Sequence, residues 1–185
     1  MNTDLTDDLL KGIEVDLSEA FDRNFEDKAF FDRAWDKRKL FNPKGTLLNV
    51  RGGGGLRGSI RSVRGPGQVS WVSSLPYASI HNEGGEIKVT AKMKRFFWAM
   101  YYKASGAVSK TKRGATRQNQ RNERLNREAA KWKALALMPV GKAIKIPERR
   151  FIGHHPQVDG IVKENADLMA KRIDTDIKNK LRPKN

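Results

Sequence analysis

Near the middle of the chain stands the stretch Tyr77-Ala-Ser-Ile-His-Asn-Glu-Gly-Gly-Glu-Ile-Lys-Val89. Side chains of a β-strand alternate between two faces, so Tyr77 and His81 would lie on the same face of a strand. Glycine adopts positive φ at little cost, and Gly84-Gly85 therefore predicts a tight turn. Apolar alternation resumes after the turn. The stretch predicts a β-hairpin at the centre of the chain.

A second informative stretch is Ile144-Lys-Ile-Pro-Glu-Arg-Arg-Phe-Ile-Gly153. Its β-branched residues predict a short strand. Pro147 ends or bends that strand, because proline cannot donate a hydrogen bond to a neighbouring strand.

Together, the patterns Tyr-Ala-x-Ile-His-x-x-Gly-Gly-x-Ile and Ile-Pro-x-Arg-x-Phe-Ile-Gly resemble the phage virion morphogenesis family. These are tail-completion and head–tail neck proteins of Mu-like and P2-like phages. A Gly-Leu-Arg-x-Ser-Ile turn of that family also has a counterpart at residues 55–60. The resemblance implies structural roles for Trp35, Tyr77, His81, Gly84, Gly85, Ile146, Pro147, Arg149, Phe151 and Gly153.

The resemblance also implies a function. Such proteins are non-enzymatic virion components that form a homo-oligomeric ring, commonly a hexamer and in some cases a dodecamer. The ring lies at the head–tail junction, between portal-side connector proteins and the tail tube or terminator, and joins the tail to the DNA-filled head. Assembly would take place in the host cytoplasm, and DNA would pass through the lumen of the ring.

Apolar spacing predicts the remaining elements. We expect a helix at about 5–26, a short helix and a loop within 27–46, strands at 59–63 and 69–74 joined by a turn at 64–67, helices around 93–101 and 125–136, and a final helix from about 157. The predicted fold is α+β, a single domain over 1–185. Its N-terminal and C-terminal helices pack on a small antiparallel sheet, a meander of three or four strands, and 91–141 is a helical basic insertion.

Composition excludes several classes of protein. Apolar residues make up 38% of the chain and charged residues 31%. No apolar run approaches the ~20 residues that span a bilayer. The chain has no cysteine, so it has neither disulfides nor a thiolate metal site. Its acidic start is unlike a secretory signal, and an intracellular protein is expected.

A net charge of +16 predicts a polyanionic or acidic partner. The most basic segment lies within residues 103–133. The candidate contacts to nucleic acid or to a neighbouring subunit are Lys110, Lys112, Arg113, Arg117, Arg121, Arg124 and Arg127. Phosphate contacts by these side chains would be independent of sequence and steeply salt-dependent. A solvated surface, or an acidic surface on another subunit, would explain the same residues.

No residue pattern predicts catalysis or a cofactor. The histidines His81, His154 and His155 lack neighbours at metal-ligand spacing. The glycine run in Arg51–Gly58 lacks the Gly-Lys-Ser/Thr ending of a phosphate loop. We therefore expect that the protein is not an enzyme. A basic nuclease is an enzymatic class that its charge leaves open. The alternative to the virion function is a nucleic-acid-binding module outside the virion.

Overall fold

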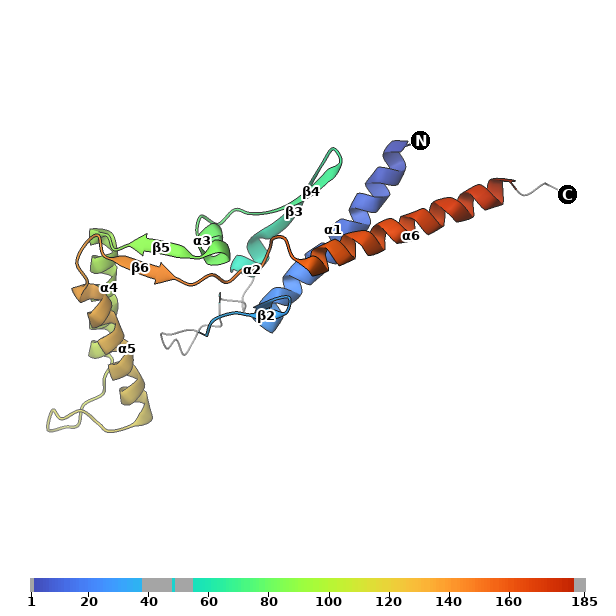
Figure 1. Ribbon diagram of the computed structural model, residues 1–185. Coiled ribbons are helices and arrows are strands. Elements are labelled where there is room, and N and C mark those ends of the chain that lie inside the picture. The colour runs from blue at the N-terminus through green and yellow to red at the C-terminus, as the bar shows by residue number, and fades with distance from the viewer. Residues whose placement is uncertain (1, 38–47, 49–54, 182–185) are drawn as a thin grey trace. The chain divides into compact units, whose positions relative to one another are not determined.

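The computed structural model describes residues 2–37, 48 and 55–181, and in this part of the chain the fold is α+β, with long helices near both ends and three two-stranded antiparallel sheets (Figure 1). The elements of the N-terminal half are α1 (Asn2–Asp27), β1 (Ala29–Phe30), β2 (Arg33–Ala34), α2 (Leu56–Ser59), β3 (Ile60–Gly65), β4 (Gln68–Ser73) and α3 (Ala78–Glu83). The others are β5 (Gly85–Lys88), α4 (Ala91–Gly106), α5 (Gln120–Leu137), β6 (Ala143–Ile146) and α6 (Pro156–Leu181).

The described residues form two compact units. The first contains 2–36, 48, 55–83 and 147–181, and the second contains residue 37 and Gly84–Ile146. Strands β5 and β6 of the second unit pair with each other, and α4 and α5 lie between them in the sequence. The predicted basic insertion, 91–141, lies within this unit.

The hairpin predicted for residues 77–89 is wrong. Ala78–Glu83 form the short helix α3, which Gly84 ends with a φ of 74°. Tyr77 and His81 do share a face, but it is a helical face, with their ring centroids 6.0 Å apart. Strand β5 instead pairs with β6, placing Ile87 opposite Ile144. A six-residue run fits a strand and a helix equally well by spacing, and tertiary context decides between them.

Two smaller predictions also need correction. The β3–β4 hairpin forms with Ile60 opposite Ser73 and with its turn where predicted, but it does not continue into a meander. Residues 28–36 contain the strands β1 and β2 and no helix. The rest of that prediction, 38–46, and the glycine run at 52–54 lie outside the described residues. The predicted helices at 5–26, 93–101, 125–136 and from 157 are confirmed.

The core of the first unit follows from the apolar stripe on α1. Leu17, Phe21 and Phe25 are buried, as their spacing of four predicts. Phe21 meets the indole of Trp71 edge to face at 5.2 Å, so α1 packs on the β3–β4 hairpin. Phe25 packs in a cluster with Trp35, Leu48, Leu56 and Phe151.

Helices α1 and α6 make close contact at Gly12. A Cβ at this position would lie 2.3 Å from Oδ1 of Asn165. The amide of Asn165 cannot move away cheaply, because its Nδ2 donates to Asp16 at 2.7 Å and to the Ile161 carbonyl at 3.0 Å. Glycine is unfavourable within a helix, and this close contact explains why residue 12 is nevertheless a glycine.

Replacing Gly12 by alanine is expected to destabilise the protein by about 1 kcal/mol. The gain in helix propensity, about 1 kcal/mol, is smaller than the cost of overpacking, about 1–3 kcal/mol. The matched control is Gly160→Ala in α6, where a Cβ meets nothing within 4 Å, so propensity alone should stabilise that variant. Urea denaturation measures both. Equal stabilisation by the two substitutions would contradict the contact.

Candidate functional site

In the second stretch that carries the family resemblance, the residues after β6 form an extended segment, and side-chain amides hold it in place. Residues 147–151 are in no strand, and the backbone N–H of Arg149 donates to the carbonyl of His81 at 2.8 Å. The N–H of Phe151 donates to Oδ1 of Asn82 at 2.9 Å, and Nδ2 of Asn24 donates to the Phe151 carbonyl at 3.1 Å. Asparagine side chains on α1 and α3 therefore supply backbone hydrogen bonds that a neighbouring strand would supply in a sheet.

Trp35 joins the same cluster from the segment after β2. Its indole Nε1 donates to the carbonyl of Arg150 at 2.6 Å, and its ring lies 5.7 Å from that of Phe25. Arg149 is 7% exposed, and its Nε and Nη2 both donate to the Asp36 carbonyl at 3.2 Å. We call Trp35, His81, Arg149 and Phe151 the motif cluster.

The other motif residues are placed around this cluster or in the second unit. Tyr77 packs on His81, and Gly153, with a φ of 144°, ends the extended segment beside Arg150. Gly84 and Gly85 connect α3 to β5, and Ile146 pairs with Gly85 just before Pro147. The polar contacts described above go to backbone groups or to an asparagine, which fits residues that hold the fold.

His81 is half-buried, and its Nδ1 is buried without a hydrogen-bond partner in the described part of the chain. Burial lowers the pKa of His81 below its ordinary value, because it disfavours the charged imidazolium, and the positive charge of Arg149 lowers this pKa further. His81 is therefore neutral near pH 7.

The lowered pKa predicts a pH dependence of stability. The unfolded chain binds a proton at His81 more readily than the folded chain does, so stability should fall as the pH drops below about 6.5. A His81→Gln variant should lose this part of the pH dependence, measured as unfolding free energy against pH. His154→Gln, at an exposed position, should keep it. Identical pH profiles for the His81 variant and the parent protein would contradict the expectation.

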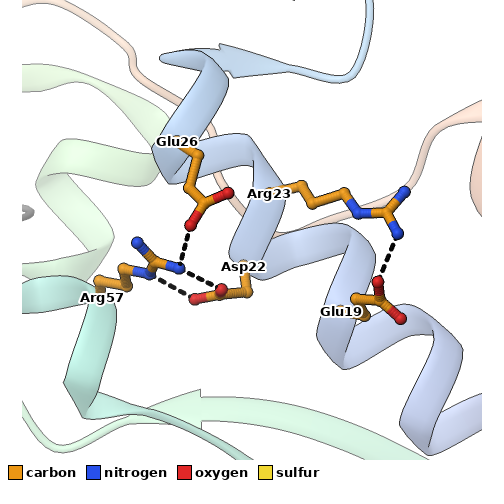
Figure 2. A network of polar contacts seen from close by, with 5 residues as sticks. All are labelled: Glu19, Asp22, Arg23, Glu26 and Arg57. Carbon is orange, nitrogen blue, oxygen red and sulfur yellow. Dashed lines mark hydrogen bonds and ion pairs between the residues drawn. The ribbon is translucent and has the colours of Figure 1, made fainter.

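An ion-pair network joins α2 to α1 near the start of β3 (Figure 2). Arg57 binds Asp22 through two bonds, one of them from Nε at 2.5 Å, and binds Glu26 at 2.8 Å. Asp22 and Glu26 are one helical turn apart, so both face Arg57, and these bonds raise the pKa of its guanidinium. Arg23 and Glu19 form a separate pair. The side chains are largely exposed, so each pair contributes at most about 1 kcal/mol.

The second unit carries most of the charge of the chain. Residues 84–146 contain 16 Lys and Arg and 3 Asp and Glu, a net +13 out of +16. Of the seven predicted contact residues, Lys110, Lys112, Arg113 and Arg117 lie on the loop between α4 and α5, and Arg121, Arg124 and Arg127 lie on α5. All seven are exposed. The structure thus brings them to one end of the α4–α5 pair.

The basic loop has an ordered base. Arg117 N–H donates to the Ser109 carbonyl at 3.0 Å, and Lys110 pairs with Thr116 as an isolated bridge. Asn122 on α5 is 1% exposed; its Nδ2 donates to the carbonyls of Ser109 and Arg117 at 2.8 and 2.7 Å. Its Oδ1 accepts from the Ser109 N–H at 3.0 Å. One buried amide therefore closes the loop.

Replacing Asn122 by alanine is expected to open the loop and to destabilise the second unit by about 2 kcal/mol, because partly buried backbone groups of Ser109 and Arg117 lose a hydrogen-bond partner. Hydrogen exchange should show faster exchange at Ser109 and Arg117. The control Asn126→Ala changes an exposed asparagine of the same helix and should leave exchange unchanged. Unaltered protection in the Asn122 variant would contradict the assigned role.

Three asparagines that bind backbone groups at these sites were not predicted from the sequence: Asn24, Asn82 and Asn122. Asn24 had a detectable signal, since it follows Phe21 by three residues and interrupts an apolar stripe. No comparable pattern marks Asn82 or Asn122.

The described residues contain no group of three or more metal-ligating side chains. None of the helices described has the length and apolarity that crossing a membrane requires. Comparison of the sequence with protein-family models found no match, and comparisons with curated proteins and with solved structures found no significant similarity.

Proposed function

We propose that this chain is a non-enzymatic structural protein of a phage virion that acts at the head–tail junction. Copies form a ring, and the ring joins the tail to the DNA-filled head. The first unit supplies the frame of the ring subunit, and the basic second unit contacts DNA in the lumen or an acidic neighbouring surface.

The observation that best supports this proposal is the motif cluster. The two blocks that carry the family resemblance lie far apart in the sequence, yet their residues bind each other: the N–H of Arg149 donates to the carbonyl of His81 at 2.8 Å, and the N–H of Phe151 donates to Oδ1 of Asn82 at 2.9 Å. Their contacts are packing and backbone hydrogen bonds, which suits a structural subunit.

Charge and exposed apolar surface support self-assembly. Residues 1–36 contain 11 acidic and 4 basic side chains, opposite in sign to the second unit. Opposite charges on one chain favour head-to-tail contacts between copies, which close into rings. Val15 on α1 and Leu168 on α6 are 64% and 57% exposed, and a neighbouring copy would cover them.

The alternative is a basic nucleic-acid-binding module outside the virion. The concentration of a net charge of +13 in residues 84–146, which belong to one compact unit, favours it. A module of this kind would bind DNA or RNA as a monomer or dimer and would have no need of the apolar surfaces on α1 and α6.

Native mass spectrometry of the full chain across a salt series, with and without duplex DNA, separates the two functions. The proposal predicts a closed hexamer or dodecamer. Leu168→Asp should shift the ring to smaller species without unfolding the subunit, whereas Asn179→Asp adds the same charge at an exposed polar position of α6 and should not. A monomer or dimer under every condition, binding DNA tightly at low salt, would contradict the ring and support the alternative.

A further inference from the structure

Helix α4 carries a cluster of three aromatic side chains, Trp98, Tyr101 and Tyr102. The Trp98 and Tyr102 rings stack with centroids 5.9 Å apart, and Tyr101 lies 5.6 Å from Trp98 and 5.2 Å from Tyr102. Tyr102 is 64% exposed. We call these three residues the aromatic platform.

Two residues of the platform, Trp98 and Tyr102, are turned away from the contact between α4 and α5. That contact uses Phe97, which stacks on Trp132 at 6.0 Å, and the buried Ala104. At 3.6 residues per turn, Trp98 and Tyr102 are rotated from Phe97 by about 100° and 140°. The folding of the pair therefore does not account for the outward position of these two rings.

The surroundings of the platform are basic. Helix α4 has no acidic residue, and its cations are Lys92, Lys94, Arg95 and Lys103. Lys94 precedes Trp98 by four residues and Arg95 precedes Tyr102 by seven, so each lies on the same side of the helix as its ring. The helix ends at the loop that carries Lys110, Lys112 and Arg113. A partner of this surface must therefore be anionic and must offer flat faces to aromatic rings.

We propose that the second unit binds single-stranded nucleic acid, with unpaired bases stacked on Trp98 and Tyr102. Lys94, Arg95 and the basic loop hold the phosphates on either side. Stacking on aromatic side chains beside a cationic track is how proteins bind single strands without sequence preference. A duplex hides the faces of its bases and would meet only the cations. The inference rests on the nucleic-acid contact in the proposed function, in which the same cations meet duplex DNA, and adds a contact for single strands at the aromatic platform.

Fluorescence anisotropy of the full chain with labelled oligothymidine, and with a duplex of the same length, tests the inference. Tyr102→Ala and Trp98→Ala should each weaken single-strand binding by about 5- to 150-fold, the equivalent of ~1–3 kcal/mol per stacked base. Duplex binding should change less than about twofold, since phosphate contacts carry it. The control Phe96→Ala removes another exposed aromatic of α4, whose ring lies 5.9 Å from that of Trp132 on α5 and outside the platform, and it should leave both affinities unchanged.

The outcomes separate this inference from the proposed function. Equal losses for single strand and duplex, or no loss in either platform variant, would overturn the platform while the DNA contact stands. If the parent protein binds neither nucleic acid at low salt, the cations serve an acidic protein surface, and both the platform and the lumen contact are overturned. Ring assembly, measured separately by mass, is independent of either result.

Discussion

Replacing Phe151 by alanine is expected to lower the unfolding free energy of the first unit by about 3–5 kcal/mol, the usual loss for a large aromatic core residue. Phe151 is 1% exposed, and its ring lies 5.0 Å from that of Phe25. Trp35, Leu48 and Leu56 complete the cluster.

Urea denaturation followed by tryptophan fluorescence measures the effect, because Trp35 packs in the same cluster. The control is Val63→Ala on β3, which shortens an apolar side chain of the same unit that is 51% exposed. This variant should lose less than about 1 kcal/mol. A Phe151 variant no less stable than the Val63 variant would show that the apolar cluster around Phe25 is not the core of the unit.

Replacing Asn24 by alanine is expected to destabilise the first unit by about 3 kcal/mol. Asn24 is 3% exposed; its Oδ1 accepts from the Phe31 N–H at 2.8 Å, and its Nδ2 donates to the Phe151 carbonyl at 3.1 Å. Alanine would leave both backbone groups without these partners, at about 1–3 kcal/mol each. Alanine favours a helix over asparagine by only about 0.7 kcal/mol, which cannot offset that loss.

Asn179→Ala on α6 is the matched control, because it makes the same change at an exposed helical position. It should be neutral or slightly stabilising. Hydrogen exchange adds a local measurement, since the Phe31 amide should lose protection in the Asn24 variant alone. Equal stability of the two variants would contradict the role given to Asn24.

Periodic elements could be predicted from the sequence, whereas pairings across long separations could not. The stripe of Leu17, Phe21 and Phe25 predicted α1 and its buried face correctly. The residues from Tyr77 to Asn82 are too few for spacing to distinguish strand from helix. Strand β5 found its partner in β6, more than fifty residues later, and nothing local to Gly84 and Gly85 signals that pairing.

The candidate sites show a similar division. The distribution of charge along the sequence pointed to seven cations within residues 103–133, and the structure places all seven of them, exposed, on the α4–α5 loop and on α5. The buried asparagines could not be ranked from the sequence, because an asparagine in a turn or on a solvated helix looks the same. Asn122 acquires its role only when the chain folds back and brings Ser109 and Arg117 to its amide.

A structural role in the virion can be tested on intact phage particles purified from cells that express this chain. The measurement is quantitative proteomics combined with chemical cross-linking. The account predicts that the chain is present in the particles, in a copy number that is a multiple of six, and cross-linked to proteins on both sides of the head–tail junction. A chain abundant in the lysate but absent from purified particles would contradict a structural role in the virion.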